Sequence, residues 1–250
     1  MDVKEFTEDR FLDGRVRMRQ FMRGFRSGLD AVMLAAAVPA RAGNTVLELG
    51  SGAGVASLCL ATRMPECAIT GIEIDGELVS LANGNAAANG MADRAHFLES
   101  DVLNLPPDLR TAFDHVLCNP PFHGAEGEIS PDESRARALQ DSGGLSRWLD
   151  TGLKRTASNG TFTIVLRADR LGEALDALPG HGVAVLPLWP KRDVPAKRVL
   201  IHLRRGKRAP FTLLPGLVLH EQDGHYTPEA DAVLRGAAAL NFNSPERQPT

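Results

Sequence analysis

Four consecutive residues, Asn119-Pro120-Pro121-Phe122, combine a side-chain amide, two prolines and an aromatic ring. The lone pair of a planar amine is delocalised into its π-system, so the amine is a poor nucleophile until acceptors bind its hydrogens. The Asn119 side chain and the Pro120 main-chain carbonyl are such acceptors, the prolines restrict the turn, and Phe122 can stack on a flat group. The motif therefore suits methylation of a planar amine, although the same residue pairs also mark ordinary turns after a strand.

A glycine-rich turn, Gly50-Ser51-Gly52-Ala53-Gly54, follows the apolar stretch Thr45-Val46-Leu47-Glu48-Leu49. Glycines permit positive φ and close approach of the backbone to a ligand, and the helix that follows presents free N–H groups. Val55 occupies the position of the third dinucleotide glycine, which disfavours NAD and FAD. Glu48 could accept hydrogen bonds from an ammonium group, which S-adenosylmethionine carries. Against the alternative of a turn without a ligand, we expect this cofactor to be lined by Glu48, Gly50, Ser51, Gly52 and Gly54.

Acidic residues also follow the next two apolar stretches. Glu73 lies about twenty residues beyond the glycines, where a ribose diol would lie, whereas Asp75 suits a helix cap. In Glu99-Ser100-Asp101-Val102, Asp101 could accept a hydrogen bond from an adenine amino group. Solvated loop acids are the alternative for each position. We expect the adenosine part of the cofactor to contact Glu73, Ile74, Asp101 and Val102.

The elements that position these residues follow from an alternation of β-branched runs and alanine-rich segments after Asn44. This alternation predicts βαβ units, a largely parallel sheet and helices on both faces. The last two strands are too close for a helical crossover, which predicts an antiparallel pairing at one sheet edge. The expected strands are Thr45–Leu49, Ala68–Glu73, Ala95–Glu99, Phe113–Cys118, Thr161–Leu166, Val183–Leu188 and Val199–Leu203. The expected helices are Leu29–Val38, Val55–Arg63, Glu77–Asn89, Leu145–Thr156, Arg170–Leu178 and Thr227–Gly236.

The composition is typical of one α/β domain. With 250 residues, 43% hydrophobic and 24% charged, the chain can bury a substantial core, so we expect a single domain over residues 1–242 and a disordered tail over 243–250. Cys59, Cys67 and Cys118 have no metal-ligand spacing, which predicts a reducing compartment and no metal site. The chain shows neither a signal peptide nor an apolar run of membrane-spanning length. We therefore expect a cytoplasmic protein without a membrane partner.

Basic residues are concentrated in two segments, although the formal net charge is −3. Residues 191–208 contain eight cations against the single Asp193, and Lys197 and Arg198 among them are candidate substrate-binding residues. The N-terminal segment contributes Arg15, Arg17, Arg19, Arg23 and Arg26. Both segments suit contacts with phosphates, whose affinity falls steeply with salt. The alternative for residues 191–208 is a solvated edge strand protected by its charge.

The order of Glu48-x-Gly50-x-Gly52-x-Gly54, Glu73, Asp101 and Asn119-Pro120-Pro121-Phe122 resembles the amino-methylating branch of class I S-adenosylmethionine-dependent methyltransferases. Residues 24–35, 195–201 and 223–227 resemble segments of bacterial tRNA (adenine-N6)-methyltransferases that modify a valine tRNA. The match spans most of the chain. The alanine run at residues 237–239 departs from that family and concerns C-terminal contacts.

The resemblance implies a Rossmann-like, seven-stranded α/β sheet, mostly parallel with one antiparallel edge strand and with helices on both faces. It implies that residues 1–43 form an N-terminal extension whose helix borders the cofactor, with Phe25 and Asp30 as further cofactor-binding candidates. The implied catalytic residues are Asn119, Pro120, Pro121 and Phe122, of which Asn119 also borders the cofactor. The resemblance implies that Phe122 packs on the substrate base, while Lys197 and Arg198 stay substrate-binding candidates because of their charge.

The expected activity is S-adenosylmethionine-dependent N-methylation of adenine N6 in tRNA or another structured RNA. An unpaired base of an anticodon loop costs little to extrude into a pocket, and the chain has little length for the recognition domain of a DNA enzyme. Two alternatives remain. One is a protein-glutamine N-methyltransferase, whose members usually carry a separate N-terminal helical domain, and the other is a non-catalytic adenosine-ligand or RNA-binding module.

Overall fold

A computed structural model of the chain describes residues 5–24, 26–121, 144–178, 180 and 182–242. Its main sheet has nine strands in the order β10-β8-β9-β7-β6-β3-β4-β5, and β11 also pairs with β8. These strands are β3 (Thr45–Leu49), β4 (Ala68–Glu73), β5 (Ala95–Glu99), β6 (Phe113–Cys118), β7 (Thr156–Arg167), β8 (Val183–Trp189), β9 (Arg198–Arg204), β10 (Thr212–Leu213) and β11 (Leu217–Val218).

Strands β3 to β7 run parallel to their neighbours in that group, whereas β9 runs antiparallel to both β7 and β8. The predicted fold class, a mostly parallel sheet with an antiparallel pairing at one end, is confirmed. The antiparallel strand β9 lies between β7 and β8, and the short strands β10 and β11 raise the count above the expected seven. Each of these two has only two residues, too few to show an alternating pattern in the sequence.

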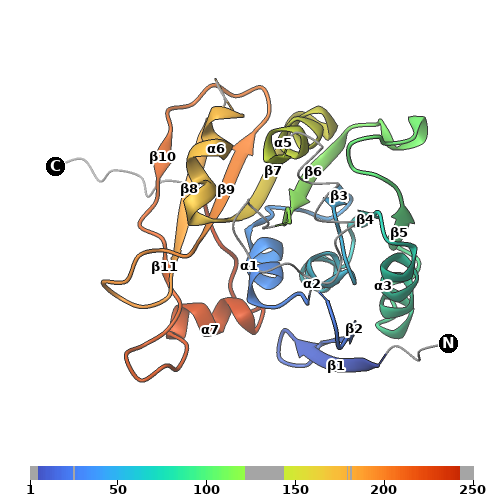
Figure 1. Cartoon of the computed structure of the whole chain (residues 1–250), viewed down its shortest axis with the longest axis horizontal. Helices are drawn as coiled ribbons and strands as arrows, with labels where there is room; N and C mark the ends of the chain where they lie inside the picture. Colours follow the sequence, from blue (N-terminus) through green and yellow to red (C-terminus); the bar gives the residue numbers. More distant parts are fainter. Residues whose placement is uncertain (1–4, 25, 122–143, 179, 181, 243–250) are drawn as a thin grey trace.

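Helices cover both faces of the sheet, as predicted. They are α1 (Leu29–Ala37), α2 (Val55–Arg63), α3 (Gly76–Ala88), α5 (Gly144–Arg155), α6 (Leu171–Asp176) and α7 (Pro228–Leu234). Figure 1 shows α5 and α6 above the sheet and the other four below it. Successive residues of a strand belong to two separate hydrophobic clusters, one on each face of the sheet. Val46 of β3 packs in the cluster that contains α1 and α2, whereas Leu47 packs in the cluster that contains α5. This alternation follows from the period of two in a strand that is buried on both faces.

The N-terminal segment forms a hairpin that the sequence analysis did not predict. Strands β1 (Phe6–Phe11) and β2 (Val16–Phe21) pair antiparallel and lie beside α3, in dark blue at the lower edge of Figure 1. The side chain of Asn85 accepts from Arg19 N at 2.9 Å and donates to Arg19 O at 3.0 Å. Asn89 makes the same two bonds to Arg17, at 2.9 and 2.7 Å. The side-chain amides of Asn85 in α3 and of Asn89 at the end of that helix thus bind the free backbone edge of β2 as a neighbouring strand would.

The ends of the other elements lie within a few residues of the prediction, with two differences. Strand β7 begins at Thr156 and is longer than expected, and the helix expected from Arg170 begins as a 3-10 turn at Ala168–Arg170. Asp75 caps α3 as predicted, because its side chain accepts from Glu77 N at 2.9 Å and Leu78 N at 3.4 Å. The predicted tail at 243–250 lies outside the described residues. Within the described ranges, no helix is long and apolar enough to cross a membrane.

Candidate active site at the carboxyl end of the sheet

The carboxyl ends of four adjacent parallel strands bring the predicted site residues to one edge of the sheet. Leu49 of β3 lies beside Cys118 of β6 and Ile72 of β4, and Ile72 lies beside Leu98 of β5. The residues that follow these strand positions therefore share this edge, and they include Gly50, Glu73, Asp101 and Asn119. Open α/β sheets bind their ligands in this place.

Two buried polar atoms at this edge lack a hydrogen-bond partner among the described residues. They are the Oδ1 atom of Asn119, directly after β6, and the Oγ atom of Ser51, in the turn after β3. The other such atoms in the described part belong to guanidinium groups. Leaving a buried donor or acceptor unpaired costs about 1–3 kcal/mol, so these groups are unfavourable unless something else binds them. A ligand with polar groups fits this pair.

The three glycines of the turn have different surroundings: two pack against aromatic rings, and one has open space beside its backbone. Gly50, Gly52 and Gly54 have φ angles of 69°, 55° and 87°, which favour glycine. A Cβ atom on Gly50 would lie 2.7 Å from the Trp148 ring, and one on Gly54 would lie 2.8 Å from the Phe97 ring. A Cβ atom on Gly52 would meet nothing within 4 Å. Gly52 therefore leaves its backbone open to a ligand, while the other two allow close packing.

Glu48 is buried beneath this turn and points to α2. Its Oε2 atom accepts hydrogen bonds from the backbone N–H of Ser57, at 3.0 Å, and from the Ser57 hydroxyl. Burial raises the pKa of Glu48 from 4.5 to about 8, and the nearby charge of Glu73 acts in the same direction. The protonated form therefore predominates at neutral pH. A cation beside this carboxyl group would favour the ionised form, as expected for the ammonium of the predicted cofactor.

The residues expected to contact adenosine combine acids with apolar surface. Glu73 Oε2 accepts from Gly52 N at 2.9 Å, and Glu73 Oε1 accepts from Asp75 N at 3.1 Å. Ile74 is 53% exposed directly after β4, which is a high fraction for an apolar side chain. Asp101 is exposed and accepts from Leu103 N at 2.8 Å, whereas Val102 is buried. The edge therefore offers carboxylates and one apolar side chain to a ligand.

The structure pairs two residues for which we predicted different roles. Arg198 Nε lies 2.8 Å from Asp30 Oδ2, so a predicted substrate-binding cation and a predicted cofactor-side acid form an ion pair. Lys197 is exposed beside them, and Pro120 and Pro121 follow Asn119 at the end of β6. Phe25 and Phe122 lie outside the described residues.

Two residues near the site were missed by sequence reasoning. Trp148 of α5 packs on Gly50, and Arg170 Nη1 donates to the Pro121 carbonyl at 3.4 Å. Arg170 is also held by both carboxylate oxygens of Glu173, at 3.0 and 2.8 Å. The position of Arg170 after β7, the strand beside β6, is the one sequence signal that could have indicated it.

The basic segment 191–208 is not one continuous strip in space. Arg198, at the start of β9, lies beside Arg167 at the carboxyl end of β7, whereas Arg204 lies beside Thr161, closer to the amino end of that strand. Lys191, Arg192, Lys197 and Arg198 therefore lie at the Asn119 end of the sheet. Arg204, Arg205, Lys207 and Arg208 lie at the opposite end. We correct the single strip to two groups separated by the length of β9, about 20 Å.

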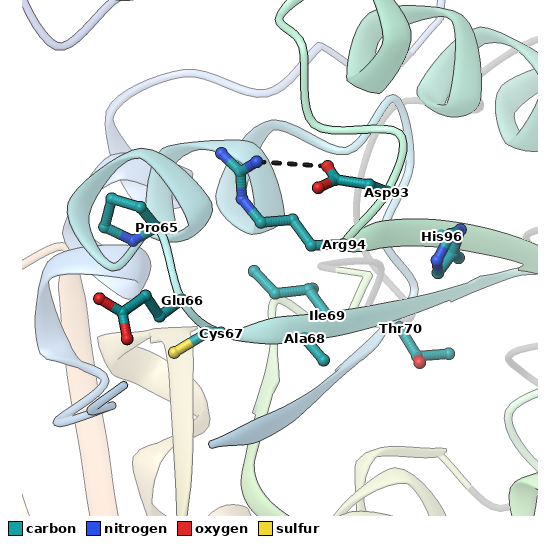
Figure 2. Close-up of a pocket in the computed structure, with 9 residues that line it drawn as sticks. All are labelled: Pro65, Glu66, Cys67, Ala68, Ile69, Thr70, Asp93, Arg94 and His96. Atoms are coloured by element: carbon teal, nitrogen blue, oxygen red, sulfur yellow. Dashed lines mark hydrogen bonds and ion pairs between the residues drawn. The ribbon is translucent and has the colours of Figure 1, made fainter. Parts of the chain in front are cut away.

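A surface hollow lies at the opposite, amino end of the sheet. Figure 2 shows its lining around the starts of β4 and β5, with Arg94 and Asp93 joined at 3.4 Å. It contains none of the predicted site residues, and we assign it no role. Across the described ranges, no group of three or more His, Cys, Asp or Glu side chains could hold a metal ion.

Comparison with known proteins gives the same picture. Residues 28–141 match the family model described as Methyltransferase small domain. A tRNA1(Val) (adenine(37)-N6)-methyltransferase from Yersinia enterocolitica is 33% identical over 219 residues, covering 83% of this chain and 83% of the relative. A protein of the same name from Aeromonas hydrophila is 31% identical over 205 residues, covering 80% and 84%. The crystal structure of a predicted O-methyltransferase from Agrobacterium tumefaciens shares the fold, with a TM-score of 0.71, 24% identity, and coverage of 84% of this chain and 98% of that chain.

Proposed function

Because this chain belongs to the family of S-adenosylmethionine-dependent methyltransferases that includes the tRNA1(Val) (adenine(37)-N6)-methyltransferases, we propose that it methylates the N6 amino group of an adenine in tRNA. The observation that carries this proposal is the buried Asn119 Oδ1, which has no partner within the described part of the chain. It is an acceptor at the ligand-binding end of the sheet, where an amine hydrogen would satisfy it.

In the proposed reaction the protein positions the adenine amine against the methyl donor and polarises its N–H bonds. S-adenosylmethionine, when bound, supplies an electrophilic methyl group on a sulfonium. Asn119 Oδ1 and Pro120 O accept the two hydrogens of the adenine amine, which concentrates electron density on its nitrogen for in-line attack. The nitrogen–carbon bond forms as the sulfur–carbon bond breaks, and the amine then loses one proton to solvent. Arg170, through the Pro121 carbonyl, positions the turn that presents these acceptors.

The proposed cofactor site uses the residues of the glycine turn and of the two following strand ends. Ser51 Oγ is buried without a partner among the described residues, and Gly52 leaves space beside its backbone, so both fit a polar ligand. Glu73 fits the ribose hydroxyls, Ile74 and Val102 the adenine face, Asp101 the adenine amine and Glu48 the ammonium. Asp30 and Phe25 are proposed to border the same ligand.

Substrate binding is proposed for Phe122 and for the cations at the same edge. Lys197 is exposed, and Arg198 is held by its ion pair with Asp30 at the same end of the sheet as Asn119. A phosphate backbone that approaches Asn119 would meet these charges first.

We also propose that residues 1–242 act as one methyltransferase domain and that residues 1–43 belong to it. The bonds of Asn85 and Asn89 to β2 support this, because they tie the N-terminal hairpin to α3. Residues of α7 and α1 also share one hydrophobic cluster, which joins the C-terminal part to the same core.

The experiment that tests the function offers several acceptors to the full chain. Tritiated S-adenosylmethionine is incubated with bulk tRNA, ribosomal RNA or release factors, and cofactor binding is measured separately by calorimetry. We expect transfer to tRNA that is lost in Asn119→Ala while cofactor affinity stays unchanged. Transfer to a release factor instead would support the protein-glutamine alternative, and binding without transfer to any acceptor would support a non-catalytic module.

A further inference from the structure

The outer face of the β1–β2 hairpin carries an exposed aromatic ring and three arginines. Alternate residues of the two strands are exposed, whereas Val16 and Met18 on the inner face are buried in the core. The exposed residues are Phe6, Glu8, Arg10, Arg17 and Arg19. The family match begins at residue 28, so this face lies outside the matched domain.

The aromatic end of this face is accessible to flat groups. Phe6 is 42% exposed and stacks on Phe21, with ring centroids 5.1 Å apart. The Arg19 guanidinium lies over the Phe6 ring, 5.3 Å from its centroid. A nucleobase would take the place of this guanidinium on the ring, which would leave Arg19 to contact a phosphate.

The charge on this face is available to an anionic partner. Within the described part of the chain, Arg10, Arg17 and Arg19 form no ion pair, even though Glu8 lies opposite Arg19 in the hairpin. The three cations follow the length of the hairpin, because Arg10 pairs with Arg17 near the turn and Arg19 lies nearer to Phe6. Such a row fits a chain of phosphates.

The hairpin is oriented with its aromatic end toward the candidate active site. Helix α3 begins next to Asp75 at the carboxyl end of the sheet, and β2 runs from Asn89 past Asn85 toward that end. Asn85 Nδ2 also donates to Ala53 O of the glycine turn at 3.0 Å. The hairpin turn points the other way, where Arg15 Nη2 donates to Arg235 O at 2.6 Å.

We propose that this hairpin face binds a single-stranded segment of the RNA substrate, with Phe6 stacking on a base and Arg10, Arg17 and Arg19 contacting phosphates. Stacking on an exposed ring beside a row of cations is the general mode by which proteins hold unpaired strands. The inference rests on the proposed function only in that the acceptor is RNA.

The test measures RNA binding directly and methyl transfer separately. Fluorescence anisotropy with a short labelled single-stranded RNA compares the wild-type chain with Phe6→Leu, which keeps an apolar side chain, and with Phe6→Trp, which keeps a stacking surface. A charge variant, Arg17→Gln with Arg19→Gln, leaves intact the backbone groups that Asn85 and Asn89 bind. Its matched control is Lys207→Gln with Arg208→Gln, two exposed cations at the amino end of the sheet that also form no ion pair within the described ranges.

We expect Phe6→Leu to weaken RNA binding about tenfold and Phe6→Trp to restore it. The charge variant should reduce the salt dependence of log K by about 1.4, since each phosphate contact on a single strand contributes about 0.7. The control pair and the calorimetric affinity for S-adenosylmethionine should not change. Wild-type affinity and salt dependence in both hairpin variants would overturn the proposal.

Measuring RNA affinity and methyl transfer separately also distinguishes a failure of the proposed RNA-binding surface from a failure of the proposed function. If the hairpin variants lose RNA affinity but the wild-type chain transfers no methyl group to tRNA, the surface stands and the proposed function fails. If tRNA is methylated with the same KM by every hairpin variant, the proposed function stands and the surface fails.

Discussion

The buried polar groups at the two ends of β6 differ in their hydrogen bonding: those at the amino end have partners, and the one at the carboxyl end has none among the described residues. At the amino end, His115 Nδ1 lies 2.8 Å from Thr161 Oγ1, and His115 Nε2 lies 3.0 Å from Asn44 Oδ1. At the carboxyl end, Asn119 Oδ1 is buried without a partner in the described ranges. His115 lies in β6 and Asn119 directly follows its last residue, so burial alone does not explain the difference. At the amino end the buried polar groups satisfy one another, whereas at the carboxyl end one acceptor is left unpaired at a cost to stability, and we propose that a ligand binds it.

We expect the largest effect, on the rate of methyl transfer, from a substitution at the carboxyl end of β6. Asn119→Ala removes the proposed amine acceptor, and we expect the rate of methyl transfer to tRNA to fall about 100-fold to 1000-fold, as when one preorganised polar group is removed from an active site. The free energy of unfolding should stay the same or rise by about 1 kcal/mol, because an unpaired buried group is removed. Single-turnover kinetics and urea unfolding measure the two quantities. A wild-type rate, or a marked loss of stability, would contradict the comparison.

The second effect is a pH dependence of stability at the carboxyl end. The pKa of Glu48 is raised by burial to about 8 in the folded chain, above its ordinary value of 4.5. Its contribution is therefore fully present below pH 4.5 and is lost as the pH rises through about 8. Glu48→Gln cannot ionise, so the wild type should lose stability relative to this variant across that window, by an amount on the order of a few kcal/mol.

Urea unfolding between pH 5 and 9 measures this difference. Glu66→Gln is the matched control, because Glu66 is an exposed acid at the amino end of the sheet. The control should follow the wild type at every pH. Parallel pH profiles for the wild type and Glu48→Gln would show that Glu48 is ionised in the folded chain throughout the range.

A substitution at the amino end of β6 should lower the free energy of unfolding and leave the rate of methyl transfer unchanged. His115→Leu removes the ring partner of Thr161 Oγ1 and one of the two hydrogen bonds to Asn44 Oδ1, which still accepts from Arg41 N. We expect a loss of about 1–3 kcal/mol in the free energy of unfolding at neutral pH. Burial lowers the pKa of His115 from 6.5 to about 4, so the contribution of the neutral ring is lost as the pH falls toward 4. The gap between wild type and variant should therefore narrow in acid. The transfer rate per folded molecule should not change, and a large loss of rate would show that the two ends are coupled.

The smallest effect concerns the two basic groups at the ends of β9. Arg192→Gln with Lys197→Gln removes exposed charge near Asn119, and we expect the KM for tRNA to rise severalfold and its salt dependence to weaken. Lys207→Gln with Arg208→Gln removes the same charge from the opposite end and should change neither quantity. Steady-state kinetics at several salt concentrations distinguish the pairs. Equal effects of the two pairs would mean that net charge, and not its position, controls RNA binding.

Sequence reasoning succeeded where local pattern determines structure. The runs of β3 to β6 are short, apolar and followed by turn or helix signals, so their ends and the shared edge with Glu73 and Asn119 could be predicted. The strand expected at residues 199–203 also implies that the basic residues before it and after it lie at opposite ends of the sheet. The alternation of apolar and charged residues in β2 is also visible in Val16-Arg17-Met18-Arg19, but each strand of the hairpin has only six residues.

Other features depend on tertiary contacts that no local pattern encodes. The approach of Trp148 to Gly50, the bond of Arg170 to Pro121 and the pairing of Asp30 with Arg198 join residues far apart in the sequence. The unsatisfied Asn119 Oδ1 depends on everything that surrounds it, and a sequence cannot show that an acceptor has no partner.

The most direct test of the central claim identifies the methylated atom. Bulk tRNA is incubated with the full chain and S-adenosylmethionine and digested to nucleosides, with Asn119→Ala and His115→Leu treated in parallel. Liquid chromatography with mass spectrometry then compares the products with standards of the isomeric methyladenosines, which have equal mass. We expect N6-methyladenosine in tRNA from the wild type and from His115→Leu, and a rate of formation lower by about 100-fold or more with Asn119→Ala. Formation of N6-methyladenosine by Asn119→Ala at the wild-type rate, or a methyl group on another nucleoside, would contradict it.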